Sequence, residues 1–130
     1  MRKIAVLVLV LMVTACAYKH QPVYNVDNPM PRWMQDVSSS KVEDLIVAAG
    51  APRDWKFTHV ADGHLVATQT HEKYSATVDI FFDRAHWRIV YQDSAGLLYT
   101  GSEIHSHYNS WIHLLEHDIE QKFGAMAVSR

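Results

Sequence analysis

Cysteine is almost absent from this chain of 130 residues, because Cys16 is the only one. A single cysteine excludes an intramolecular disulfide, and in an exported protein it leaves one thiol that needs a separate role. Clusters of lysine and arginine are also missing, and the formal net charge is −2. This charge distribution argues against a nucleic-acid partner and against a polybasic lipid-binding surface.

Long apolar runs are confined to the amino terminus. Arg2 and Lys3 precede the apolar run 4–13, and small residues follow it, which is the pattern of an export signal. The run is shorter than the roughly 20 residues that a membrane-spanning helix needs. We therefore expect residues 1–15 to be removed as a signal peptide.

The residues at the expected cleavage point, Val13-Thr14-Ala15-Cys16, resemble the lipobox of bacterial lipoproteins. The resemblance implies that diacylglycerol is attached to the Cys16 sulfur, and that Cys16 becomes the first residue, acylated with a fatty acid such as palmitate. Ala17 follows in place of the aspartate that resembles an inner-membrane retention signal, so we expect an outer-membrane anchor facing the periplasm. The alternative is an ordinary signal peptide followed by a free cysteine.

The segment after the anchor shows no helical or strand periodicity. Three prolines prevent a continuous helix there: Pro22, Pro29 and Pro31. We expect residues 16–38 to form a lipid-anchored tether whose apolar end, including Trp33, packs on the domain. A single globular domain then spans 39–124, and 125–130 form a tail.

A short helix is predicted at roughly residues 41–49. Ser40 and Glu43 fit a capping box, in which each side chain satisfies a free backbone N–H. Gly50 would supply a left-handed closing residue, and Pro52 follows where a helix cannot continue. The apolar residues at helical spacing are Val42, Leu45, Ile46 and Ala49.

Four strands are predicted after this helix. Residues 55–61 and 64–71 are joined by Asp62-Gly63, which suits a type I′ hairpin turn. Residues 76–82 and 87–91 alternate between apolar and polar side chains, so each has one buried face. Residues 96–101 form a loop or a short extra strand.

The last element is a helix that ends near Gly124. Six apolar residues at intervals of three or four fall on one stripe: Ile104, Tyr108, Trp111, Leu115, Ile119 and Phe123. The predicted fold is a two-layer α+β domain of order α-β-β-β-β-α. In it a four-stranded antiparallel meander is covered on one face by the short N-terminal helix and the longer C-terminal helix.

Three segments resemble a group of small, functionally uncharacterised bacterial lipoproteins and exported proteins. They are Ala48-Ala49-Gly50 with Asp54-Trp55, Tyr91-Gln92-Asp93-Ser94 with Leu98-Tyr99, and the Ile-His-x-x-Tyr-Asn-x-Trp-Ile motif at 104–112 with Leu115 and Asp118-Ile119. The resemblance implies an exported location and this order of elements, and it implies no activity. Ser106-His107 and Ser110 stand where the group more often has Arg-Asn and Arg, which removes two positive charges.

A candidate ligand-binding group lies around the start of the last helix: Asp93, Ser94, Tyr99, His105 and Asn109. We favour a structural role, in which these side chains join the preceding loop to the first helical turn by hydrogen bonds. A groove for a small ligand or peptide, with an aromatic wall, is the alternative.

Metal binding and hydrolysis are weaker hypotheses. The chain has nine histidines, and His113 and His117 lie i,i+4 on the last helix, but both face solvent and two ligands make a weak site. We therefore expect no metal and no other cofactor. A hydrolase would combine Ser94 and His105 with Asp93 or Asp79, yet the chain has no local nucleophile signature.

Strict alternation places Phe81 on the sheet face away from the helices, where an exposed phenylalanine suggests a contact surface. The sequence thus predicts a non-enzymatic interaction module that is lipid-anchored in the cell envelope. Its partner would be an envelope protein or peptide bound through the open sheet face or a sheet edge. A small periplasmic hydrolase and a surface-histidine metal binder are the alternatives.

Overall fold

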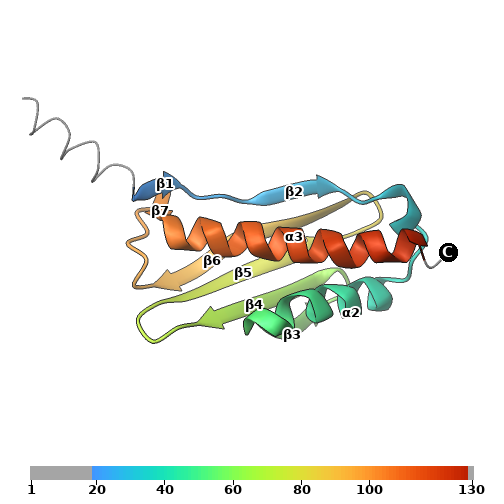
Figure 1. Ribbon diagram of the computed structural model, residues 1–130, viewed down its shortest axis with the longest axis horizontal. Coiled ribbons are helices and arrows are strands. Elements are labelled where there is room, and N and C mark those ends of the chain that lie inside the picture. The colour runs from blue at the N-terminus through green and yellow to red at the C-terminus, as the bar shows by residue number, and fades with distance from the viewer. Residues whose placement is uncertain (1–18, 129–130) are drawn as a thin grey trace, which may run out of the picture.

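Two helices lie against one face of an antiparallel sheet in the computed structural model, which describes residues 19–128 (Figure 1). The elements in chain order are β1 (His20–Pro22), β2 (Val26–Pro29), η1 (Arg32–Met34), α2 (Ser39–Gly50), η2 (Ala51–Arg53), β3 (Lys56–Ala61), β4 (His64–Thr70), β5 (Ser75–Phe82), β6 (His86–Ala95), β7 (Glu103–His105) and α3 (Ser106–Val128). The expected signal peptide and Cys16 lie outside the described residues. The predicted α+β class is confirmed.

The sheet has five strands rather than the four predicted. Its order is β2-β6-β5-β4-β3, and β1 and β7 form a separate two-stranded sheet. The additional strand β2 pairs antiparallel with β6 and comes from the segment that we expected to be a tether. Three side chains of that segment are buried in the core: Val26, Met30 and Met34. Residues 19–38 therefore pack as part of the fold.

Helix α2 begins and ends differently from the prediction. Ser38, not Ser40, caps it by accepting a hydrogen bond from the Lys41 N–H at 3.3 Å. Gly50 has φ −87°, so it is not a left-handed closing residue. Its small size matters instead, because a Cβ there would lie 2.5 Å from the Phe57 ring. The left-handed residue is Asp54, with φ 67°, at the end of η2.

The turn between β3 and β4 depends on Gly63. Gly63 has φ 75°, whereas Asp62 has no positive φ, so this is not the predicted type I′ turn. The pairing of the two strands shifts between His59 and Ala61, and this irregularity accommodates the different turn. A Cβ at Gly63 would collide with the Phe82 carbonyl oxygen, so this position requires glycine.

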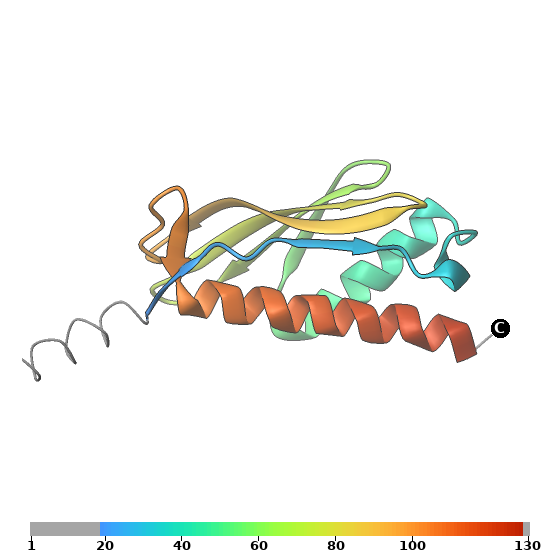
Figure 2. The same cartoon turned by 90° about the horizontal axis from the view of Figure 1, so that it is seen from above.

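The alternation predicted for the two central strands is confirmed. Every second residue of β5 is buried, from Ala76 to Phe82, and the buried face continues into β6 at Trp87 and Ile89. These side chains form the core together with α2 and α3, which both lie on the same side of the sheet (Figure 2). No helix within residues 19–128 packs on the opposite face.

Helix α3 starts later and ends later than predicted. Ile104 belongs to β7, and the helix continues beyond Gly124 to Val128. Trp111 is only half-buried, and Ile112 takes its place in the buried stripe, because a period of 3.6 residues from Tyr108 reaches Ile112 more closely. Within residues 19–128, no helix is long and apolar enough to cross a bilayer.

Two helical glycines provide a matched test of this packing. Gly50→Ala should lower the free energy of unfolding by about 1–3 kcal/mol, because the new methyl group must displace the Phe57 ring. Gly124→Ala should raise it by about 0.5–1 kcal/mol, because nothing lies near its Cβ position and alanine favours helix. Urea unfolding of both variants measures the difference. Equal effects at the two positions would contradict the packing at Gly50.

Candidate functional site

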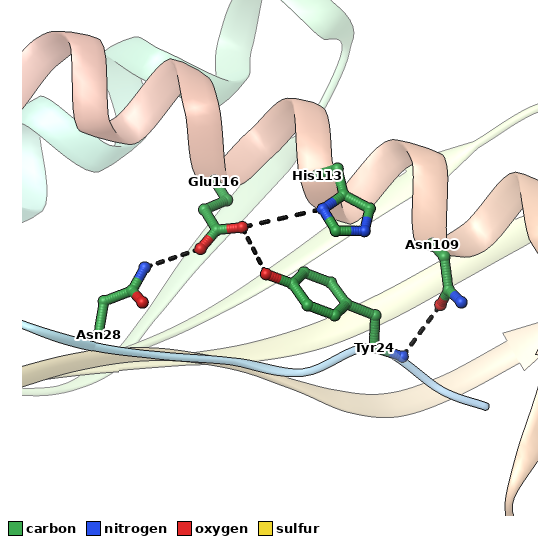
Figure 3. Close-up of polar contacts among 5 residues, drawn as sticks. All are labelled: Tyr24, Asn28, Asn109, His113 and Glu116. Carbon is green, nitrogen blue, oxygen red and sulfur yellow. Dashed lines mark hydrogen bonds and ion pairs between the residues drawn. The ribbon is translucent and has the colours of Figure 1, made fainter.

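Asn109 fastens the N-terminal segment to α3. Its side chain is buried, and the Oδ1 atom accepts a hydrogen bond from the Tyr24 N–H at 3.0 Å (Figure 3). The Nδ2 atom donates to the Pro22 carbonyl at 2.9 Å. Nδ2 also lies 3.1 Å from Oε1 of Gln21. One amide therefore bonds both to the end of β1 and to the connection between β1 and β2.

Glu116 makes a second junction two turns further along α3. Its two carboxylate oxygens accept hydrogen bonds from the Tyr24 hydroxyl and from Nδ2 of Asn28, each at 2.7 Å (Figure 3). The His113 ring stacks on Tyr24 with 3.9 Å between ring centroids. The hydrogen bond to Glu116, together with burial, raises the pKa of Tyr24 to about 12, so the hydroxyl remains a donor.

Of the predicted candidate group, Asn109 thus bonds to residues 21–24 rather than to the loop before the helix. Sequence reasoning missed its companions Tyr24, Asn28 and Glu116. The only signal in the sequence was the apolar character of the N-terminal segment. Long-range pairing between residues some 85 positions apart leaves no periodic pattern to detect.

Ser94 and Tyr99 both contact Tyr91. The Tyr91 hydroxyl lies 2.7 Å from Oγ of Ser94, and the Tyr91 and Tyr99 rings stack at 4.1 Å between centroids. Asp93 accepts a hydrogen bond from the Ser94 N–H at 2.8 Å. Tyr91 also meets the buried Tyr108 edge-on, so this aromatic column runs from the core to the loop 96–102.

His105 joins the loop to β7 through its backbone. Its N–H donates to the Leu97 carbonyl at 2.9 Å, and its Nδ1 atom accepts from the His107 N–H at 3.1 Å. Burial lowers the pKa of His105, and nearby His107, His20 and Lys19 lower it further. The neutral ring is therefore the favoured form, as its acceptor role requires.

The groups of the hydrolase hypothesis have other partners. The Ser94 hydroxyl contacts Tyr91, and Oδ1 of Asp79 lies 2.7 Å from Nε2 of His64. Within residues 19–128, no hydrogen bond joins Ser94 to His105. The described side chains do not form a serine-histidine-aspartate relay in this arrangement.

The histidines of α3 lie on its surface. His113 stacks on Tyr24, and His117 is exposed. In the part of the chain that the structure describes, no three histidine, cysteine or acidic side chains converge to hold a metal ion.

The sheet face opposite the helices carries a small aromatic and charged cluster. Phe81 is half-buried there rather than fully exposed, because His64 stacks on it at 4.3 Å and the Arg88 guanidinium lies 5.6 Å from its ring centroid. We call this surface the outer face. It carries His64, Val66, Thr68, Thr77, Asp79, Phe81, Arg88, Val90 and Gln92.

Comparison with protein-family models and with curated proteins finds no match for this chain. The resemblance carried by residues 104–112 therefore stays a prediction.

The Asn109 junction gives a stability test. Asn109→Ala should lower the free energy of unfolding by about 2–3 kcal/mol, because it leaves the partly buried Tyr24 N–H and the Pro22 carbonyl without their partner. The neighbouring exposed Ser110 provides the control. Ser110→Ala should change the free energy of unfolding by less than about 0.5 kcal/mol. Chemical denaturation measures both. If Asn109→Ala lowers the free energy of unfolding no more than Ser110→Ala does, the Asn109 hydrogen bonds do not stabilise the fold as stated.

His105 predicts a pH dependence. Its pKa is lowered in the folded state, so the unfolded chain takes up the proton first, below its ordinary pKa of about 6.5. The contribution of His105 to the free energy of unfolding is therefore fully present above that pH. It is lost as the pH falls through the pKa that His105 has in the folded state. His105→Asn keeps an acceptor without titrating. Urea unfolding at pH 8 and pH 5 should therefore show a smaller acid loss in this variant than in the wild type, and an equal loss would disprove the assignment.

Proposed function

We propose that the protein is a lipid-anchored lipoprotein of the bacterial cell envelope, facing the periplasm from the outer membrane. In this proposal its domain is a non-enzymatic module that binds an envelope protein or peptide through the outer face. The export signal, the lipobox-like residues before Cys16 and the lone cysteine support the anchor.

The observation that carries the binding proposal is the one-sided covering of the sheet. Both helices pack on the same face, so neither helix of the described part of the chain covers the outer face (Figure 2). At one end of that face the His64 ring stacks on Phe81, and the Arg88 guanidinium lies over the same ring. Aromatic and arginine side chains are the residue types that dominate binding energy in protein interfaces.

The two edges of the sheet are less suited to a partner than its face. Edge strand β3 carries Lys56 and an irregular register after His59, and both features discourage the addition of another strand. Edge strand β2 has only four residues, and its Asn28 side chain is engaged by Glu116 on α3. We therefore favour the outer face.

Site-specific photo-cross-linking tests this proposal. A photoreactive phenylalanine analogue at Phe81 should form a discrete adduct with one envelope protein in intact cells. The same analogue at Leu114, an exposed residue of α3, should give at least about five-fold less, because α3 lies on the opposite side of the sheet. Adding Arg88→Glu should reduce the Phe81 adduct while the protein stays folded.

Equal or diffuse labelling at the two positions would contradict binding through the outer face. The anchor is measured in the same preparation by mass spectrometry of the mature amino terminus. An unmodified Cys16 would overturn the envelope anchor without affecting the cross-linking result.

A further inference from the structure

The loop between β6 and β7, residues 96–102, lies at the same end of the domain as the start of the N-terminal segment. Backbone hydrogen bonds link Leu97 to His105 at 2.9 Å and Ser102 to Val23 at 3.1 Å. His105 in turn pairs with His20 of β1. The C-terminal end of α3 and the β3–β4 turn lie toward the other end (Figure 1).

This loop exposes two adjacent apolar side chains. Leu98 is 63 % exposed and Tyr99 is 43 % exposed, whereas the preceding Leu97 is buried. Leu98 has φ 56°, a left-handed conformation that is unfavourable for a bulky residue. The backbone is thus held in a strained form that turns Leu98 toward solvent, which points to a role for the exposed side chain.

Ring stacking and a backbone hydrogen bond hold the loop in one conformation. Tyr99 stacks on Tyr91, which packs against the buried Tyr108. The Thr100 N–H donates to the Glu103 carbonyl at 3.0 Å. The loop would therefore lose little conformational entropy if Leu98 and Tyr99 became buried in another environment.

The connection to Cys16 is short. Lys19 follows Cys16 by three residues, which span at most about 11 Å. Lys19 is itself fixed, because its carbonyl accepts a hydrogen bond from the Ser106 N–H at 3.0 Å. If Cys16 is acylated, the bilayer surface must lie within that reach of Lys19, at the end of the domain that carries Leu98 and Tyr99.

We propose that the side chains of Leu98 and Tyr99 insert into the interfacial region of the phospholipid leaflet that holds the Cys16 anchor. This inference rests on the lipid anchor of the proposed function. Tyrosine favours the headgroup region of a bilayer, and leucine favours the apolar region below it. The anchor keeps the loop at the surface, so the two side chains need only modest affinity of their own.

The charges at this end favour a neutral phospholipid surface. Lys19 and Lys73 are opposed by Glu72, Asp93 and Glu103, which gives a sum of −1 when the histidines are neutral. The turn that carries Lys73 is adjacent to the loop, since a Cβ on Gly96 would meet the Lys73 carbonyl. We therefore expect contact without a requirement for anionic lipid.

The contact would orient the whole domain. Strands β5 and β6 meet at the loop end through Ser75 and Ala95, and Phe81 is near the other end of β5. With the loop on the bilayer, the strands run away from the membrane. The cluster around Phe81 is then presented far from the lipid surface, where a soluble envelope partner can reach it.

A nitroxide depth measurement tests the inference. The lipidated protein is placed in phosphatidylcholine vesicles, and Leu98→Cys is spin-labelled, because acylation blocks Cys16. The matched control is Val60→Cys, which is 51 % exposed in the wild type and lies in β3 near the distant turn. At Leu98 the label should be relaxed several-fold more by oxygen than by a water-soluble nickel complex, and the opposite order should hold at Val60.

Three results separate the possibilities. If acylated protein floats with the vesicles but both labels are equally accessible to nickel, the interface contact is overturned and the anchor stands. If the protein is not acylated and does not float, the anchor and the contact both fail. If Leu98→Cys does not fold, a label at exposed Thr100 in the same loop should report headgroup depth, and water exposure there also overturns the inference.

Discussion

The junction between the N-terminal segment and α3 is the constraint on which the rest of the arrangement depends. A buried amide at Asn109 and a carboxylate at Glu116 hold a segment that has little regular structure of its own. With that segment in place, β2 completes the sheet, and Val26 and Met30 close the core. Buried polar groups of this kind specify one arrangement, because any other leaves backbone groups unpaired.

Periodicity predicted the elements that bury one continuous face. The alternation in β5 and the apolar stripe of α3 are local patterns, and both were found with small errors at their ends. The strands β1 and β2 were missed because three or four residues with prolines carry no alternation. Gly50 was assigned to a cap, although only the tertiary position of Phe57 explains it. The candidate site was identified in part, since Asn109 binds a segment that sequence could not place beside it.

The same junction links the fold to the proposed function. A flexible tether would let the domain tumble near the membrane, whereas the chain from Lys19 onward is part of the folded structure. An anchor attached three residues earlier would therefore fix one end of the domain toward the bilayer. The candidate residues Ser94, Tyr99 and His105 build that end of the domain, and the outer face is the surface that we propose for a partner.

The central claim is that the N-terminal segment belongs to the folded domain. Native-state hydrogen exchange at the Tyr24 amide tests it most directly, because that N–H donates to the buried Asn109 side chain. We expect strong protection at Tyr24, within about ten-fold of the amides in β5, which open only with the core. Exchange at the rate of an unstructured peptide would show instead that the segment is a free tether.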